Sequence, residues 1–193
     1  MGSRVECFWM DPIEWARESL RRYAGKDSCP SPWGYCNASV LLEGEVPYPF
    51  AHQFPDIKGC LFGEDRTGIA HDDTRWPSRC ASCGRPFDEG ANWQQHVSRL
   101  FVGGGHRCLL EDMPVGAMYD SSWWPETTAD GIVLSVVCPP GGRANHWMVD
   151  GPSKSGGRWT REGVIPKVTA RPSILIGSSG YHGFLTDGFL VEC

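Results

Sequence analysis

The pattern of apolar and polar residues near the start of the chain predicts a helix over residues 11–25. Its first residues, Asp11-Pro12-Ile13-Glu14, offer an acidic N-cap, a proline at the first helical position and a glutamate three residues after the cap. Apolar residues then recur at helical spacing, at Ile13, Ala16, Leu20 and Tyr23. Gly25 follows them and is suited to end the helix.

A second segment of helical pattern begins at Asp88. Its apolar positions are Trp93, Val97, Leu100 and Phe101, and Gly103-Gly104-Gly105 then breaks the pattern. The stretch between the two predicted helices is rich in proline, glycine and aromatic residues. Because X-Pro steps disfavour helical backbone, we expect this stretch to be loop with short extended pieces.

From Gly131 onward the pattern changes to short strands. Apolar and β-branched segments alternate with turn residues, and the expected strands are Ile132–Cys138, His146–Val149, Ser173–Ile176, Tyr181–Leu185 and Phe189–Val191. Asp187-Gly188 supplies a hairpin turn that can adopt positive φ. Strands this close together predict an antiparallel sheet or a small sandwich.

Together these elements predict an α+β fold that is mostly β. Residues 1–110 would hold the two helices and a Pro/Cys-rich region, and residues 111–193 the antiparallel β region, within one compact unit. With 193 residues, the chain is long enough to bury a core without help from cysteines. No segment approaches the ~20 apolar residues of a membrane span, and Met1 to Trp9 lacks the apolar segment of a secretory signal.

The charge composition limits the kinds of partner that we expect the protein to bind. Charged residues make up 21% of the chain and the formal net charge is −5. Because neutralisation of phosphates dominates affinity for nucleic acid, a net-acidic chain is a poor candidate for that role. The one basic stripe is interpreted as the solvated face of the first helix, and it consists of Arg17, Arg21, Arg22 and Lys26. We therefore expect protein partners, and neither nucleic acid nor a membrane.

Cysteines give the clearest chemical signal. The chain has nine of them, and without a secretory signal they indicate a reducing compartment, where paired cysteines are more often metal ligands than disulfides. The segment Cys80-Ala81-Ser82-Cys83-Gly84 has the spacing of a zinc knuckle, in which a tight turn brings two thiolates to one Zn²⁺. Gly84 permits the backbone conformation that such a turn needs.

The knuckle supplies only half of a tetrahedral site. His71 and Cys36 are the favoured candidates for the other two ligands, with Cys60 and Cys29 as alternatives. The simpler alternative is that Cys80 and Cys83 are free thiols, since cysteine often acts as a small apolar residue. A cysteine-rich site is usually closed, so the expected zinc is structural.

Evidence for catalysis is weaker. The sequence has no His-Glu-x-x-His motif, and His71-Asp72-Asp73 fails the pattern of the zinc deaminases. His182 could act as a general base with Asp187 or Asp150, and His146 is a further candidate. The alternative is that both histidines are hydrogen-bonded residues of a half-buried sheet.

Several segments resemble a family of uncharacterised proteins encoded by actinobacteria and their phages. The segments are Arg21–Tyr23 through Cys29-Pro30 to Tyr35–Ala38, His71–Asp73 through Arg75–Pro77 to Cys83-Gly84 and Pro86-Phe87, Pro114–Met118, and the ending Pro172–Ile174 with Tyr181–Gly188. The resemblance implies a zinc-knuckle module, an actinobacterial or phage origin and no established catalytic residues. It places the protein in the bacterial cytoplasm or in a phage virion.

The expected function is therefore that of a zinc-stabilised structural or interaction protein, such as a capsid- or tail-associated component of a phage particle. Its nine tryptophans fit this role, because tryptophan is enriched where proteins bind one another. The partners would be copies of itself or phage structural proteins. Two alternatives remain open, namely a metal- or histidine-dependent hydrolase using His182, His146 and Asp187, and a phage-encoded inhibitor of a host factor.

Overall fold

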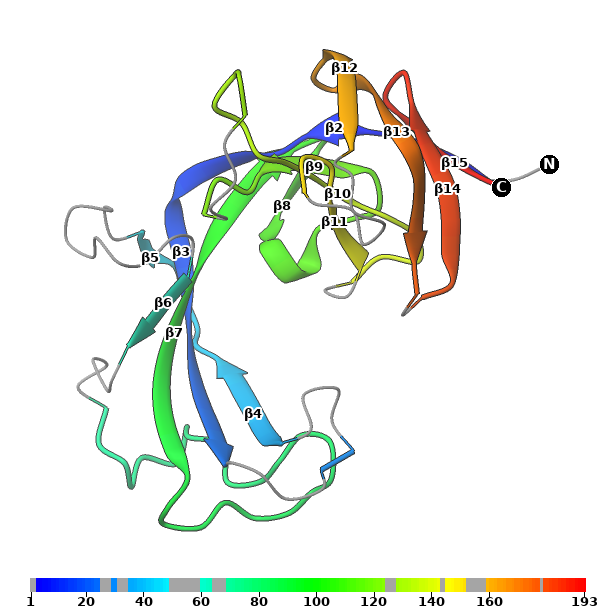
Figure 1. The fold of residues 1–193 in the computed structure, drawn as a ribbon. Helices are drawn as coiled ribbons and strands as arrows, with labels where there is room; N and C mark the ends of the chain where they lie inside the picture. Colours follow the sequence, from blue (N-terminus) through cyan, green and yellow to red (C-terminus); the bar gives the residue numbers. More distant parts are fainter. Residues whose placement is uncertain are drawn as a thin grey trace. The chain divides into compact units, whose positions relative to one another are not determined.

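The computed structural model describes most of the chain (Figure 1), and its described residues are 3–24, 29–30, 35–48, 60–63, 69–123, 128–142, 145–151, 159–177 and 179–193. For residues 60–63, 95 and 96 only the backbone is described. The described residues are mostly strand, and the helical structure among them is a short 3-10 turn at Leu110–Asp112. Among the described residues, no helix is long and apolar enough to span a membrane.

The prediction of two N-terminal helices is wrong, and with it the α+β fold class. Both segments are long strands, β3 (Asp11–Ala24) and β7 (Asn92–Gly103). In β3 the fully buried Ala16 and Leu20 lie four residues apart. A spacing of four fits one face of a helix, but it equally fits one face of a strand, where side chains alternate with a period of two.

Pairing with neighbouring strands explains why β3 is a strand and not a helix. β3 pairs antiparallel with β4 (Cys36–Leu41) from Ser19↔Leu41 to Ala24↔Cys36, and with β5 (Val46–Pro47) beyond it. In the sheet, β7 lies on the other side of β3, followed by β6 (Cys60–Gly63). Cross-strand hydrogen bonds and burial thus outweighed a capping signal and helix propensity, which are weak determinants by comparison.

The chain divides into two compact units. Unit 1 contains residues 1–13 and 100–193, and unit 2 contains residues 14–99. β3 and β7 belong to both, because each strand crosses a boundary between the units. The sequence had suggested a division near residue 110.

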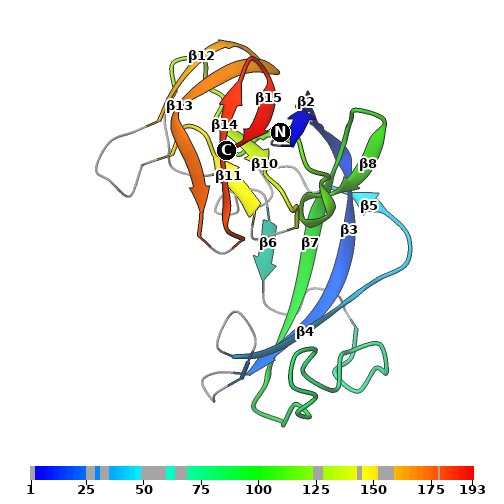
Figure 2. The same ribbon diagram turned by 90° about the vertical axis from the view of Figure 1, so that its right-hand side faces the viewer.

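Unit 1 contains an antiparallel sheet of five strands (Figure 2). Its order is β1 (Arg4–Glu6), β15 (Phe189–Glu192), β14 (Tyr181–Thr186), β13 (Lys167–Ile176) and β12 (Thr160–Val164). The hairpin between β14 and β15 turns at Asp187-Gly188, where φ is 47° and 74°. Strands therefore occupy this part of the chain, and its turn has the positive φ angles that the sequence indicated.

A second sheet of unit 1 has four strands. Its order is β11 (His146–Met148), β10 (Leu134–Val137), β9 (Ala117–Asp120) and β2 (Phe8–Trp9), with β2 and β9 parallel. β8 (His106–Leu109) pairs with β7. Inward-facing residues of both sheets share one apolar core, which includes Met118, Leu134, Val168, Ile174 and Leu185.

Unit 2 carries the cysteine-rich region. Its segment 69–91 lacks long strands and is held by short turns and by an isolated bridge between Arg79 and Pro86. Cys29, Cys36 and Cys80 form a small buried cluster in this unit, with Phe87 and Ala24 packed against it. Three cysteine side chains thus form part of the buried interior of this unit.

Candidate metal centre

Four cysteines of unit 2 converge on one point. The Sγ atoms of Cys29, Cys36, Cys80 and Cys83 all lie within 4.8 Å of one another. The distances from Cys29 to Cys80 and from Cys36 to Cys83 are both 3.6 Å. A disulfide would need about 2.05 Å, whereas four sulfurs held about 2.3 Å from one tetrahedral ion are about 3.8 Å apart. The four cysteines therefore have the spacing of a metal site.

The knuckle is built by a tight turn after Cys80. The N–H of Gly84 donates to the carbonyl oxygen of Cys80 at 3.0 Å, which brings the chain back on itself. Gly84 has φ of +71°, in the left-handed region that glycine adopts without a steric penalty. Arg79 donates from its side chain to the carbonyl oxygen of Gly84 at 3.0 Å and fixes the open side of the turn.

The other two cysteines come from the connection between β3 and β4. Cys36 is the first residue of β4 and pairs with Ala24, the last residue of β3. The chain therefore leaves the sheet after Ala24, passes through Cys29 and returns to the same place at Cys36. A hydrogen bond of 3.0 Å from the N–H of Ala81 to the carbonyl oxygen of Asn37 joins the knuckle to β4.

Two of the four cysteines have pKa values shifted in opposite directions. Burial raises the pKa of Cys80, but hydrogen bonds from the backbone of Cys83, Ser82 and Asn37 outweigh burial and lower this pKa to about 6. Burial, followed by hydrogen bonds to the neighbouring sulfurs, raises the pKa of Cys36 to about 12. On their own, these two shifts favour a thiolate at Cys80 over one at Cys36. A bound cation would favour thiolates at the remaining positions as well, because it offsets their mutual repulsion.

A layer of stacked side chains supports the cluster. Phe87 packs against the cysteines, and the guanidinium of Arg22 lies 5.2 Å from the Phe87 ring and 3.7 Å from the Trp93 ring. Arg22 is buried and donates to the carbonyl oxygen of Asp88 at 2.9 Å. The sequence had placed Arg22 on a solvated face with Arg17 and Arg21. In a strand, Arg22 instead points to the face opposite these two.

The structure places the predicted ligands as follows. It brings Cys80, Cys83 and Cys36 together with Cys29, which the sequence analysis had ranked behind His71. His71 is outside this group of four, and its ring stacks on Trp93 with centroids 4.4 Å apart. The side chain of Cys60, on β6, lies outside the described part of the chain.

A signal for Cys29 was present in the sequence. Only six residues separate it from Cys36, and a hairpin between β3 and β4 brings such a short connection back to its starting point. A helix over residues 11–25, which the sequence pattern predicts, includes no such hairpin and therefore gives no reason to prefer Cys29.

The candidate catalytic residues lie elsewhere, in unit 1. His182 shares a hydrogen bond of 3.3 Å with Ser173, and His146 shares one of 2.8 Å with Tyr119. Asp187 stands in the hairpin turn, where its N–H donates to Thr169. Among the described residues, the group of His, Cys, Asp and Glu side chains close enough to hold a metal ion is the four cysteines, and neither histidine belongs to it.

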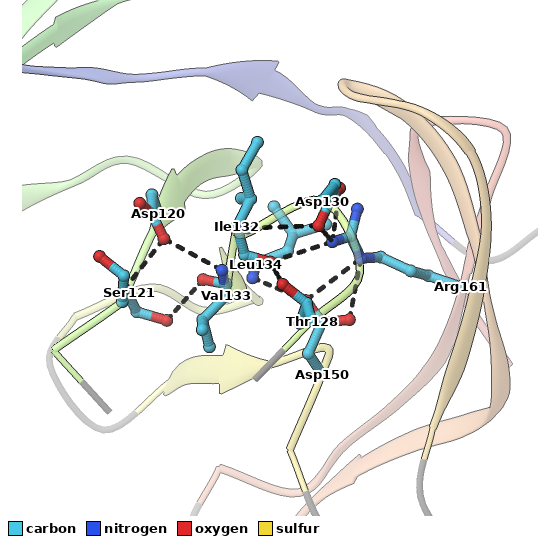
Figure 3. Close-up of polar contacts among 10 residues, drawn as sticks. Asp120, Ser121, Thr128, Asp130, Ile132, Val133, Leu134, Asp150 and Arg161 are labelled. Carbon is cyan, nitrogen blue, oxygen red and sulfur yellow. Dashed lines mark hydrogen bonds and ion pairs between the residues drawn. The ribbon is translucent and has the colours of Figure 1, made fainter. Parts of the chain in front are cut away.

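Asp150, the other carboxylate considered for His182, is engaged by an arginine (Figure 3). Its carboxylate accepts from Nε of Arg161 at 2.8 Å and from the N–H of Leu134 at 2.7 Å. Arg161 also donates to Asp130 at 2.8 Å. The structure thus gives Asp150 a role in joining β12 to β10 and the loop before it.

Comparison with known proteins adds no relative. No protein-family model, no curated protein and no solved structure matches the chain. The cysteine cluster is therefore the feature from which function has to be argued.

Proposed function

We propose that this chain is a zinc-stabilised structural or interaction protein whose ion is held by Cys29, Cys36, Cys80 and Cys83. The observation that carries the proposal is the convergence of four Sγ atoms within 4.8 Å of one another. Sulfur-only sites favour zinc among the common divalent ions, and a set of four cysteine ligands is typical of structural zinc.

The number and burial of the cysteine ligands support a structural role for the ion. Four cysteines fill all positions of a tetrahedral ion, so none is left for a substrate or an activated water. Three of them are buried, and the backbone around Cys80 is arranged to stabilise its thiolate. When bound, zinc supplies charge and four directional bonds without redox chemistry of its own. The ion would join the β3–β4 connection to segment 80–84.

The interaction role is supported by apolar side chains at the surface of unit 1. Leu175 on β13 is 70% exposed and Phe184 on β14 is 45% exposed. Both point away from the core that their neighbours Ile174 and Leu185 fill. Membership of a phage particle or of another assembly, and inhibition of a host factor, are specific forms of this proposal that rest on the resemblance of the sequence alone.

Metal analysis of the purified protein tests the proposal. We expect about one equivalent of zinc by elemental analysis. Cys29→Ser and Cys36→Ser should both lose most of that zinc, because each removes one of four ligands. Cys193→Ser is the matched control, since Cys193 is a free cysteine outside the cluster, and it should retain zinc.

Two results would contradict the metal site. One is wild-type protein with no bound metal after purification under reducing conditions with zinc present. The other is a Cys29→Ser variant that keeps a full equivalent of zinc at unchanged affinity. An iron content near one equivalent, with the visible absorption of ferric thiolate, would keep the site and replace the metal.

A further inference from the structure

The four sulfurs of the cluster differ in exposure. Cys29, Cys36 and Cys80 are buried, whereas Cys83 is exposed. The turn at Gly84 is consistent with this, because no atom beyond the two adjacent residues lies within 4 Å of the position that a Gly84 Cβ would occupy. A small reagent in solution therefore meets Cys83 before it meets any other ligand.

We propose that Cys83 is a modification site at which hydroperoxides oxidise the cluster, join Cys83 to Cys36 as a disulfide and release the metal ion. This inference rests on the proposed metal site. It assigns the cluster a second property, a response to a class of oxidant, that a purely structural role does not require.

The chemistry takes place in two steps. The Cys83 thiolate attacks one oxygen of the hydroperoxide, so that an S–O bond forms and the O–O bond breaks. The departing oxygen takes a proton and leaves as water or an alcohol. The Cys36 thiolate then attacks the sulfur of Cys83, an S–S bond forms, the S–O bond breaks, and hydroxide leaves and takes a proton. Two thiolates lose two electrons, which reduce the peroxide.

Geometry favours Cys36 as the second partner. Its Sγ lies 3.6 Å from that of Cys83, and forming the disulfide shortens this distance by about 1.5 Å. Once Cys36 and Cys83 are joined, the ion keeps only two of its four ligands and is released.

The experiment uses the zinc-loaded 193-residue protein carrying Cys193→Ser, which removes a thiol that is exposed and outside the cluster. Hydrogen peroxide is added stepwise, zinc release is followed with a chromophoric chelator, and disulfides are mapped by mass spectrometry of peptides made without reductant. We expect one Cys36–Cys83 disulfide for each zinc released. Dithiothreitol with added zinc should restore the metal content.

A second variant separates oxidation from mere loss of a ligand. Cys83→His keeps a side chain that zinc accepts but removes the exposed sulfur, so zinc release by peroxide should slow by roughly tenfold or more. If this variant binds no zinc, the disulfide map in the Cys193→Ser background decides alone.

Some outcomes would overturn the inference while leaving the metal site intact. These are zinc retained after peroxide has been consumed at other cysteines, release at an equal rate from Cys83→His, or a map in which Cys29–Cys80 or Cys80–Cys83 predominates. Protein that holds no metal before peroxide is added overturns the proposed function, and the inference with it.

Discussion

Arg161 is the residue with the densest set of charged contacts in the described part of unit 1. It donates to Asp150 at 2.8 Å, to Asp130 at 2.8 Å and to the carbonyl oxygen of Ile132 at 3.0 Å (Figure 3). Its side chain is 13% exposed and that of Asp150 is 11% exposed. Because both charges are largely removed from water, loss of one leaves the other poorly compensated.

We therefore expect Arg161→Met to lower the free energy of unfolding by about 2–3 kcal/mol. Arg75→Met is the matched control, since Arg75 also pairs with an aspartate at 2.8 Å but its side chain is 55% exposed. An exposed pair of this kind contributes little to stability, because water screens its charges. Urea unfolding of both variants measures the difference. Equal effects would mean that the Arg161 contacts add little beyond a surface ion pair.

Ionisation of the Asp130 carboxyl makes the stability that these contacts contribute depend on pH. Its hydrogen bond with Arg161 lowers the pKa of Asp130 below its ordinary value. Because the pKa of Asp130 is lower in the folded than in the unfolded protein, its ionised carboxylate stabilises the fold. This stabilisation is fully present above about pH 4 and is lost as the pH falls through the folded-state pKa. We expect Asp130→Asn to flatten the decline of the urea midpoint below about pH 4.

The acid dependence that Asp73 adds to stability has to be eliminated before that of Asp130 can be measured. Hydrogen bonds with Arg75 lower the pKa of Asp73 to about 2, so this carboxyl adds its own acid dependence with the same sign. The comparison is therefore between Asp73→Asn and the double variant with Asp130→Asn. Identical acid profiles of the two would show that Asp130 contributes nothing to acid sensitivity.

At the scale of elements, the end of β7 is packed against the chain just before β3. A Cβ on Gly103 would lie 2.9 Å from Cα of Met10 and would overlap the carbonyl oxygen of Trp9. Backbone atoms cannot turn aside as a flexible side chain can, so the strand itself would have to move.

Gly103→Ala should consequently lower the free energy of unfolding by about 2 kcal/mol or more. Gly177→Ala provides the matched control, because Gly177 has no positive φ and no atom lies within 4 Å of its added Cβ. The control should stay within about 0.5 kcal/mol of wild type in urea unfolding. A Gly103→Ala variant as stable as the control would refute close packing at this point.

What the sequence could predict at this scale depended on how far the pairing partner lay along the chain. Asp187-Gly188 fixed a hairpin whose strands are neighbours in sequence, so local turn chemistry was sufficient. For β3 the apolar spacing of Ala16 and Leu20 suits a helix and a strand alike. The choice came from contacts with β4 and β7, and β7 lies about seventy residues away, which no local pattern reports.

The same limit applied to the candidate metal centre. Cys80 and Cys83 carry their own spacing signal, since both cysteines lie in one turn. Cys36 was a favoured candidate from the sequence, whereas Cys29 is favoured only once Ala24 is known to pair with Cys36 and to close the hairpin. His71 has a suitable ligand atom, but its ring stacks on Trp93 and lies outside the group of four cysteines, a placement that residue type alone does not report.

At the scale of the whole molecule, the candidate metal centre belongs to one of two compact units. All four cysteines lie in unit 2, whereas the large apolar core formed by residues such as Met118 and Ile174 lies in unit 1. Binding of zinc to a structural site contributes an apparent free energy of about 10–16 kcal/mol in small peptides. That is as large as the total stability of an ordinary domain, about 5–15 kcal/mol. Unit 2 should therefore depend on the ion far more than unit 1 does.

Hydrogen exchange with and without a zinc chelator measures this dependence. Chelation should abolish protection in peptides covering β4 (residues 36–41) and segment 79–91, because their contacts converge on the sulfurs. Peptides covering β13 to β15 (residues 167–192) should retain their protection, since the core of unit 1 contains none of the ligands. The control receives the chelator already saturated with zinc. Loss of protection throughout residues 167–192 would contradict this expectation, because it would mean that the ion stabilises both units as one cooperative system.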